Sequence, residues 1–230
     1  MDNAQKYAPV TCLITAYNAE LYIEEAIASL VQQTRPPAEI ILVDDGSTDA
    51  TAMLAKQAGG AILRVIHQKN AGSAAGRNRG LKEISQPFVM FADADDISHP
   101  DRIERCLDAF AEMPELAAVF GNWQNFWIDA LVNEEDAESS KHLKGEQKSR
   151  LLCTALLRSE FSSSLGEFDT TLALSEVHWV VRALKTGSEI HDLGVATYRR
   201  RIHHSNISRG KTPDDMFAMV QRLRHASGSA

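Results

Sequence analysis

Short apolar runs alternate with amphipathic segments along the first part of the chain. The runs are rich in Val, Ile, Leu and Phe, which is typical of buried strands, and the segments between them have helical spacing or helix-capping residues. Strands that alternate with helices of this length predict a parallel sheet with right-handed crossovers. The predicted strands cover residues 10–15, 39–43, 61–66 and 88–91, and the predicted helices cover residues 19–33, 70–84 and a segment that ends at 58, capped by Ser47 or Thr48.

The rest of the chain is less regular. Residues 132–150 contain almost no apolar side chains and predict a surface loop. After residue 209 a single amphipathic segment, 216–223, precedes a Ser-Gly-Ser-Ala end, so we expect a tail that is partly helical and then frayed. Helices are predicted at 100–113 and 176–186, and strands at 117–127, 151–157 and 195–202.

Composition excludes several classes of protein. Of the 230 residues, 44% are hydrophobic and 24% are charged, which is ordinary for a globular chain. Thirty-one acidic against 24 basic residues give a net charge of -7, which argues against binding nucleic acid over a broad face. With no apolar run near 18 residues and no leader pattern, we expect a cytoplasmic protein without a transmembrane segment. The three cysteines are widely spaced and are interpreted as reduced core thiols.

Polar side chains follow each predicted strand of the first half. Ligands of open parallel sheets bind at the carboxyl ends of the strands, so these side chains are expected to meet at one edge. A purely structural protein would not need such a concentration. The residues concerned are Thr15, Tyr17 and Asn18 after the first strand, Asp44 and Asp45 after the second, His67 and Asn70 after the third, and Asp93, Asp95 and Asp96 after the fourth.

The acidic turn at residues 93–96 is the sharpest of these features. Its sequence, Asp-Ala-Asp-Asp, places three carboxylates in four residues, and they repel one another unless they are protonated or neutralised by a cation. Mg²⁺ commonly binds one or two carboxylates together with substrate phosphates. The alternative is a solvated acidic turn that caps the helix near residue 100.

Two other polar segments have weaker signals. Asp44 and Asp45 precede Gly and Ser, the usual residues of a turn, although one of the pair could accept a hydrogen bond from a base or ribose. Arg77 is interpreted either as a surface arginine or as a partner for phosphate. Because neither GxxxxGK[ST] nor GxGxxG follows a strand, ATPase and dinucleotide-binding functions are disfavoured.

Taken in order and spacing, these motifs resemble a family 2 glycosyltransferase with the GT-A fold. The resemblance covers about residues 8 to 208. It implies a mixed, mostly parallel α/β domain, with residues 1–114 as the half that binds the nucleotide-sugar donor and 115–208 as the acceptor and catalytic half. The matching segments are residues 10–18, 41–49, 70–72, 77–78, 91–96, 166–169, 179–182 and 201–208.

The resemblance also implies a role for each matching residue. Thr15, Tyr17 and Asp45 would hold the nucleobase and ribose, with Asp44 as a further contributor and Arg77 near the base or diphosphate. Asp95 would bind Mn²⁺ or Mg²⁺ that bridges the donor diphosphate. Asp93 would contact the ribose or the metal shell, and His203 would complete the metal site.

The expected catalytic base departs from the family pattern. Inverting members usually have an Asp within a Glu-Asp pair six residues before the helix arginine, and here that position is Glu176, preceded by Ser175. Glu can also take a proton from an acceptor hydroxyl, although it is one methylene longer. The alternatives are that Glu176 is only a solvent-facing helix-start carboxylate, or that His178 is the base.

The sequence therefore predicts an inverting, metal-dependent transfer of one sugar from a UDP-, GDP- or dTDP-sugar to a hydroxyl acceptor of the glycan, lipid-linked or another class. The alternative is a non-catalytic nucleotide-sugar-binding partner that keeps the fold, because the Glu-Asp pair is missing. Trp123, Phe126 and Trp127 are either core residues or a surface on which an acceptor sugar stacks. The segment 216–223 indicates either peripheral contact at the inner membrane face or a packing or homodimer helix.

Overall fold

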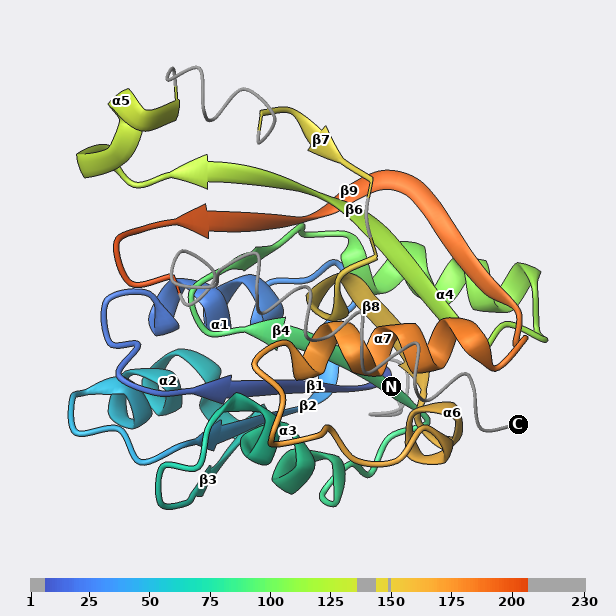
Figure 1. Cartoon of the computed structure of the whole chain (residues 1–230), viewed down its shortest axis with the longest axis horizontal. Coiled ribbons are helices and arrows are strands. Elements are labelled where there is room, and N and C mark those ends of the chain that lie inside the picture. The colour runs from blue at the N-terminus through green and yellow to red at the C-terminus, as the bar shows by residue number, and fades with distance from the viewer. Residues whose placement is uncertain (1–6, 136–143, 149, 207–230) are drawn as a thin grey trace.

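The computed structural model describes residues 7–135, 144–148 and 150–206. Strands and helices alternate through its first half, as the apolar runs predict, and a second half of more mixed order follows (Figure 1). The first half contains β1 (Ala8–Ala16), α1 (Ile23–Val31), β2 (Pro37–Asp44), α2 (Thr51–Gly59), β3 (Leu63–His67), α3 (Ser73–Leu81), β4 (Phe88–Asp93), β5 (Ile97–Ser98) and α4 (Arg102–Glu112). The second half contains β6 (Ala118–Trp127), α5 (Val132–Glu135), β7 (Glu146–Gln147), β8 (Ala155–Arg158), α6 (Ser159–Ser164), α7 (Ser175–Lys185) and β9 (Ile190–Ile202).

All of these strands join one sheet in the order β3-β2-β1-β4-β8-β6-β9-β5, with β7 paired to β6. The first four strands in this order are parallel, which confirms the predicted parallel core. Beyond β4 the direction changes, because β8 is antiparallel to both β4 and β6, whereas β6 and β9 are parallel. The carboxyl ends of β1 to β4 therefore lie at one edge, next to the point where strand pairing changes from parallel to antiparallel.

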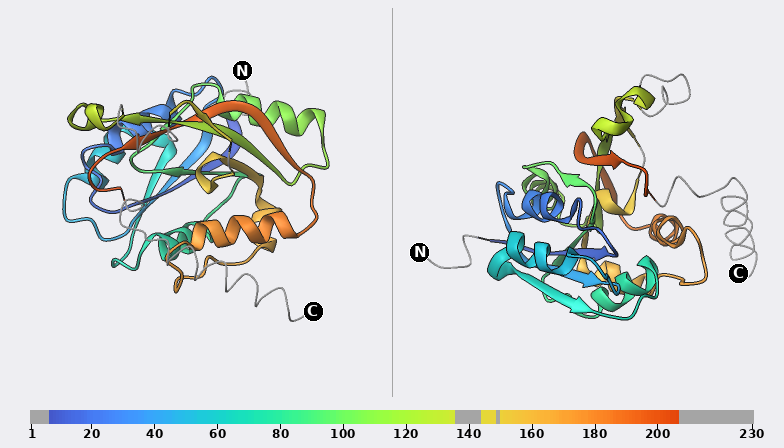
Figure 2. Two further views of the ribbon diagram at one scale, coloured as in Figure 1. Left: turned by 45° about the horizontal axis from the view of Figure 1, so that its top comes forward. Right: turned by 90° about the vertical axis from the view of Figure 1, so that its left-hand side faces the viewer.

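Helices cover both faces of the sheet (Figure 2). Successive side chains of a strand point to opposite faces, so each buried strand contributes to two cores. On β1, Cys12 and Ile14 pack in the core formed with α1, α2 and α4, whereas Leu13 packs in the core formed with α3 and α7. Trp179 of α7 stacks on Phe168 with ring centroids 4.9 Å apart and anchors the second core.

A buried arginine joins the two halves of the sheet. The Arg102 side chain, at the start of α4, is fully buried and donates hydrogen bonds to the carbonyl oxygens of Phe91 on β4 and Ala155 on β8, each at 3.1 Å. It also donates to Ser98 Oγ at 3.1 Å, and its guanidinium lies 5.3 Å from the Tyr198 ring centroid. Because the fork satisfies several carbonyl and hydroxyl groups at once, one side chain fixes β4, β5, β8 and β9 around a single point.

Two local predictions need correction. Neither Ser47 nor Thr48 caps α2, because Ala50 occupies the N-cap position. Ser47 Oγ instead accepts a hydrogen bond from the Asn18 N–H at 3.0 Å, so these polar residues join the loop after β2 to the loop after β1. The segment 132–150, which was predicted to be a loop, contains α5 and β7. Strand β7 forms by backbone pairing with β6, and the few apolar residues of this segment do not predict that pairing.

Other expectations fall outside the described residues. These are residues 136–143 and 149 of the predicted loop and the tail from residue 209 onward, including the segment 216–223. Among the helices that the structure does describe, none has the length and apolarity needed to cross a bilayer.

Close packing of α3 against β1 generates a stability prediction. A Cβ added at Gly80 would lie 2.1 Å from Leu13 Cδ1, and Leu13 itself is buried. In an ordinary helix, Gly→Ala stabilises by about 1 kcal/mol, but here overpacking should reverse the sign. We expect Gly80→Ala to lower the free energy of unfolding by about 1–3 kcal/mol in urea denaturation. In a Leu13→Ala background, where the clashing atoms are gone, the same change should cost much less; an equal cost in both backgrounds would contradict this packing.

Candidate active site

A pocket of about 860 Å³ opens at the carboxyl ends of β1, β2 and β4. Its walls come from both halves of the chain, since residues from β6, α7 and β9 also line it. Eight of the nine site residues predicted from the sequence line this pocket, and the exception is Asp44. The eight are Thr15, Tyr17, Asp45, Arg77, Asp93, Asp95, Glu176 and His203.

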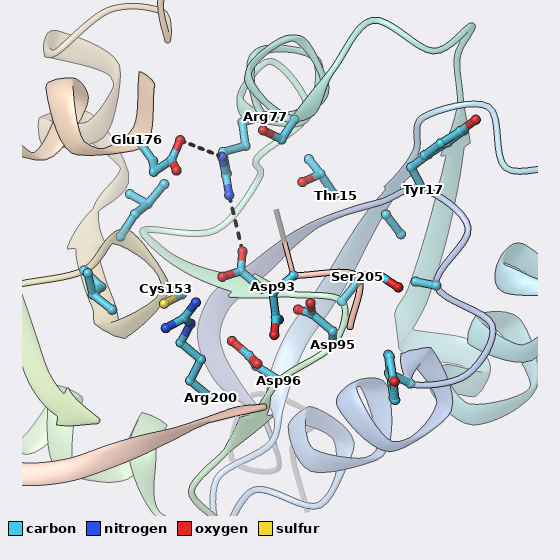
Figure 3. A pocket seen from close by; sticks show the side chains of 18 of the residues that line it. Thr15, Tyr17, Arg77, Asp93, Asp95, Asp96, Cys153, Glu176, Arg200 and Ser205 are labelled. Carbon is cyan, nitrogen blue, oxygen red and sulfur yellow. Dashed lines mark hydrogen bonds and ion pairs between the residues drawn. The ribbon is translucent and has the colours of Figure 1, made fainter. Parts of the chain in front are cut away.

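The acidic turn at the end of β4 forms the floor of the pocket (Figure 3). The side chains of Asp93 and Asp95 are partly exposed to the pocket, at 37% and 30%. Asp96 is only 5% exposed and accepts a hydrogen bond from the Arg201 N–H at 2.7 Å. A solvated turn does not fit this burial, and the N-cap of the next helix is Asp101. The turn is therefore built into the site.

The surroundings of Asp93 and Asp96 raise the pKa of both carboxyls. Burial raises the pKa of Asp96 well above its usual range, and the charges of Asp95 and Asp93 act in the same direction. Burial also raises the pKa of Asp93; the Arg77 charge opposes this, and the charges of Asp95 and Glu176 add to it. A divalent cation at this turn would relieve the repulsion that adds to the effect of burial on both pKa values.

Asp95 and His203 form the pair best placed to hold such a cation. The distance from His203 Nε2 to Asp95 Oδ2 is 2.9 Å, and the His203 side chain is buried. Since His203 Nδ1 accepts a hydrogen bond from the Ser205 N–H at 3.3 Å, this pattern assigns the ring proton to Nε2, from which it must leave before metal binds. In the described part of the chain no group of three or more His, Cys, Asp or Glu could hold a metal. Two protein ligands fit a cation that is shared with substrate phosphates.

Arg77 lies between the acidic turn and the candidate base (Figure 3). Its Nη2 is 3.2 Å from Asp93 Oδ1, and its Nη1 is 3.9 Å from Glu176 Oε2. The side chain is 12% exposed, and among the described residues Nη1 has no hydrogen-bond partner. A buried N–H that faces a pocket without a partner is suited to an anionic oxygen of a ligand.

The side of the pocket formed by β1 and β2 is suited to a flat ligand. Tyr17 is 52% exposed and offers its ring at the rim, with Thr15 nearby on β1. The Asp45 carboxylate is buried and accepts the backbone N–H groups of Ala71 and Gly72 at 2.9 and 2.8 Å. Asp45 thus orders the loop before α3 as well as lining the pocket.

Asp44 lies away from the pocket. Its carboxylate is 2.9 Å from His67 Nδ1 and accepts a hydrogen bond from the Ser47 N–H at 3.1 Å. Asp45, the next residue, makes its contacts with the loop before α3 instead. The structure therefore gives Asp44 a role in the turn rather than in the pocket.

The two candidate bases occupy different surroundings. Glu176 is the second residue of α7, its side chain is 30% exposed, and it points into the pocket toward Arg77. Val177 and Val180 line the pocket with it, but His178 does not. This placement favours Glu176 over His178 as a group that could take a proton from a bound substrate, and it does not fit a carboxylate that faces only solvent.

Several lining residues were not predicted as site residues. Arg200 of β9 lies 5.8 Å from the Trp123 ring centroid on β6, and both line the pocket. Arg150, also at the wall, pairs with Asp192 through two contacts of 2.9 and 2.6 Å. The available signal for Arg200 was the run of three arginines in a predicted strand, because alternation sends the middle one to the opposite face.

Cys153 is a core thiol, as expected, but it also borders the pocket beside Asp93 (Figure 3). Burial raises the pKa of this thiol well above its usual range, and the nearby carboxylates of Asp93 and Asp96 add to the effect. The thiol therefore stays protonated near neutral pH and is not a nucleophile.

Comparison with known proteins places this geometry in context. The family model described as "Glycosyl transferase family 2" matches residues 11–162. The chain is 33% identical over 139 residues to "Glycosyltransferase GlyA" of Streptococcus pneumoniae serotype 4, which covers 60% of this chain and 19% of that protein. It is 34% identical over 118 residues to "Chondroitin synthase" of Escherichia coli, which covers 50% of this chain and 17% of that protein. The chain thus spans less than a fifth of the length of either relative.

Two solved structures share the fold over most of this chain. S. aureus TarS 1-349 in complex with UDP-GlcNAc superposes with a TM-score of 0.73 at 20% identity, covering 93% of this chain and 65% of that one. Mannosyltransferase PcManGT from Pyrobaculum calidifontis, in complex with GDP-Man and Mn²⁺, gives a TM-score of 0.64 at 19% identity, covering 94% of this chain and 68% of that one. The expected GT-A fold is confirmed.

The raised pKa of Asp96 predicts how stability depends on pH. An unfolded Asp ionises near its ordinary value of 3.8, whereas the folded protein keeps the Asp96 proton to higher pH, so wild-type stability is lost as pH rises through the folded pKa. Asp96→Asn keeps an oxygen acceptor for the Arg201 N–H and never ionises. In metal-free buffer we expect its melting temperature to match wild type near pH 4 and to exceed it at pH 7 by at least about 2–4 °C, the shift given by 1 kcal/mol.

Asp101→Asn is the matched control, since its dependence should have the opposite sign. Burial acts to raise the pKa of Asp101, but the hydrogen bond and charge of Arg105 outweigh it and lower the pKa. That carboxylate contributes stability above pH 4 that is lost on acidification, so this variant should be less stable than wild type at neutral pH. A difference between Asp96→Asn and wild type that stays constant from pH 4 to 8 would contradict the assignment.

Proposed function

The chain belongs to glycosyltransferase family 2, and from this premise we propose that it transfers one sugar from a nucleotide-diphosphate donor to a hydroxyl acceptor with inversion of configuration. The observation that carries this proposal is the meeting of Asp93, Asp95, Arg77 and Glu176 in one pocket at the strand ends. A metal-binding turn, a cation for phosphate and a general base are the groups that such a displacement requires.

The donor would lie along the ends of β1, β2 and β4. Tyr17, Thr15 and the loop ordered by Asp45 would hold the base and ribose, and Arg77 would place its guanidinium, whose Nη1 makes no hydrogen bond within the described part of the structure, near a diphosphate oxygen. One structural neighbour is described with UDP-GlcNAc and another with GDP-Man, so UDP and GDP are the first nucleotides to test. In this proposal residues 1–114 form the donor half.

Asp95 and His203 would hold Mn²⁺ or Mg²⁺, with Asp93 close to the metal shell. When bound, the cation would neutralise charge that develops on the departing diphosphate. The protein's part is to keep the carboxylates converged on the pocket despite their repulsion. One neighbour's description includes Mn²⁺, which supports trying this ion first.

Glu176 would act as the base from the opposite wall. The acceptor oxygen would form the new bond to the anomeric carbon while its proton passes to Glu176, and the bond from that carbon to the diphosphate oxygen would break. A single displacement of this kind inverts the anomeric centre. The acceptor would occupy the half formed by residues 115–208, where Trp123 offers a ring and Arg200 a cation.

The absence of the usual Glu-Asp pair favours a second candidate, a nucleotide-sugar-binding protein that does not catalyse transfer. Such a protein would bind the donor as tightly as an enzyme but would neither transfer nor hydrolyse it. Turnover of the bound donor across a panel of acceptors separates the two functions.

Nucleotide binding tests the donor site directly. We expect UDP or GDP to raise the melting temperature in thermal-shift titrations, and Mn²⁺ to increase that shift, because ligands that bind only the folded state stabilise it. In Asp95→Ala the Mn²⁺-dependent part of the shift should vanish. Stabilisation by no nucleotide among UDP, GDP and dTDP, with or without Mn²⁺, would contradict the proposed function.

Glu176→Gln tests the base separately from binding. Since the amide cannot accept a proton, turnover should fall by about 10²–10⁴-fold, whereas nucleotide binding and its Mn²⁺ dependence should be retained. His178→Gln, two residues along the same helix and outside the pocket, is the matched control and should retain turnover. If the His178 variant loses turnover and the Glu176 variant does not, the base has been assigned to the wrong residue.

A further inference from the structure

Arg201 stands behind the proposed metal ligands without touching the pocket. It follows Arg200 on β9 and is 8% exposed, and it is not among the lining residues. Its guanidinium carbon lies 5.0 Å from the Tyr22 ring centroid and 4.6 Å from that of Phe126. Aromatic rings from two distant segments, the start of α1 and the end of β6, therefore cover this cation.

Arg201 holds the acidic turn at two points. Its backbone N–H donates to Asp96 Oδ1 at 2.7 Å, and its Nε donates to the backbone carbonyl oxygen of Asp95 at 2.9 Å. The other end of the guanidinium pairs with Glu25 through Nη2. The positive charge thus lies next to a turn that carries three carboxylates, and its hydrogen bond fixes the peptide of the residue whose side chain points at His203.

The same residue is linked to the position of His203. The Arg201 carbonyl oxygen accepts a hydrogen bond from Asn206 Nδ2 at 3.1 Å, and Asn206 Oδ1 accepts one from the His203 N–H at 2.7 Å. The Tyr22 ring, which lies against Arg201, also contacts the His203 ring with centroids 4.5 Å apart. Backbone and rings thus connect Arg201 to both halves of the Asp95–His203 pair.

We propose that Arg201 is the positioning residue of the metal site, which holds Asp95 and His203 at the separation needed to share one divalent cation. This inference rests on the proposed function, because it assumes that the pair binds metal. Groups that orient metal ligands from behind commonly change metal affinity by about 10–100-fold when they are removed. Arg201 fulfils that role from β9, a strand far in sequence from the acidic turn.

The chemistry of the contact calls for arginine. A planar guanidinium can place its faces against rings and still donate from its edge to the Asp95 carbonyl and to Glu25. A lysine ammonium keeps the charge, but it is a compact donor that cannot lie flat against two rings while reaching both acceptors. Met removes the charge and the side-chain hydrogen bonds to the Asp95 carbonyl and Glu25, keeps the backbone bonds to Asp96 and Asn206, and leaves an apolar stem of similar length.

Mn²⁺ titration by calorimetry in the presence of saturating UDP, with GDP run in parallel, tests the inference. We expect Arg201→Met to weaken Mn²⁺ binding by about 10–100-fold and Arg201→Lys by a smaller factor. Nucleotide binding measured without metal should stay unchanged in both variants. Arg199→Met is the matched control, because the Arg199 guanidinium also lies 4.6 Å from the Phe126 ring centroid, but it is exposed and its side chain is outside the pocket.

The outcomes separate this inference from the proposed function. Wild-type Mn²⁺ affinity in Arg201→Met, or an equal loss in Arg199→Met, would overturn the role of Arg201 and leave the proposed function standing. If wild type binds nucleotide but no Mn²⁺, the metal proposal and this inference fall together. If Arg201→Met fails to fold, Arg201→Lys tests the inference instead, because it retains the charge and the stem. Unchanged Mn²⁺ affinity in Arg201→Lys would then overturn the inference.

Discussion

Mutual repulsion among carboxylates at the end of β4 is the constraint around which this structure is organised. Asp93, Asp95 and Asp96 lie within four residues, and Glu176 faces them from the opposite wall of the same pocket. At an effective dielectric of about 20, two unit charges 4 Å apart repel by roughly 4 kcal/mol, a large fraction of a domain's net stability. Arginines from several elements lie beside these carboxylates and offset part of the repulsion. A ligand that brings positive charge would offset more of it.

The arginines lie at different distances from the pocket, and each has a different role. Arg77 reaches into the pocket and contacts Asp93, whereas Arg201 holds the backbone of the turn from behind. Arg102 lies deeper still and contacts carbonyl oxygens of β4 and β8, where the parallel sheet meets its antiparallel neighbour. The strand order reverses between β1 and β4, next to this contact, and an open α/β sheet leaves room for a ligand at such a point. The Arg102 hydrogen bonds that join β4 to β8 therefore also support the floor of the pocket.

Local pattern was enough to predict the parallel core and the polar strand-end residues of the pocket, whereas Glu176 and His203 were expected from the family resemblance. The alternation of short strands and helices specifies β1 to β4, and residues just past strand ends must meet at one edge. What the sequence left unpredicted depends on contacts between distant segments. The cap of α2 was missed because Ser47 bonds to Asn18 of another loop, and Asp44 is not among the pocket residues because its carboxylate contacts His67 and Ser47. Strand alternation separates Arg200 from Arg199 and Arg201, but the pairing of β9 with β6 that brings Arg200 to the pocket depends on contacts between distant segments.

Arg77 links the two ends of the proposed reaction. In the structure its guanidinium lies between Asp93 and Glu176, so one cation contacts both the acidic turn and the proposed base. A diphosphate in the pocket would compete for this cation, and a metal would take over the neutralisation of Asp93. Glu176 would then share its nearest cation with the bound donor, so donor binding would change the surroundings of the proposed base.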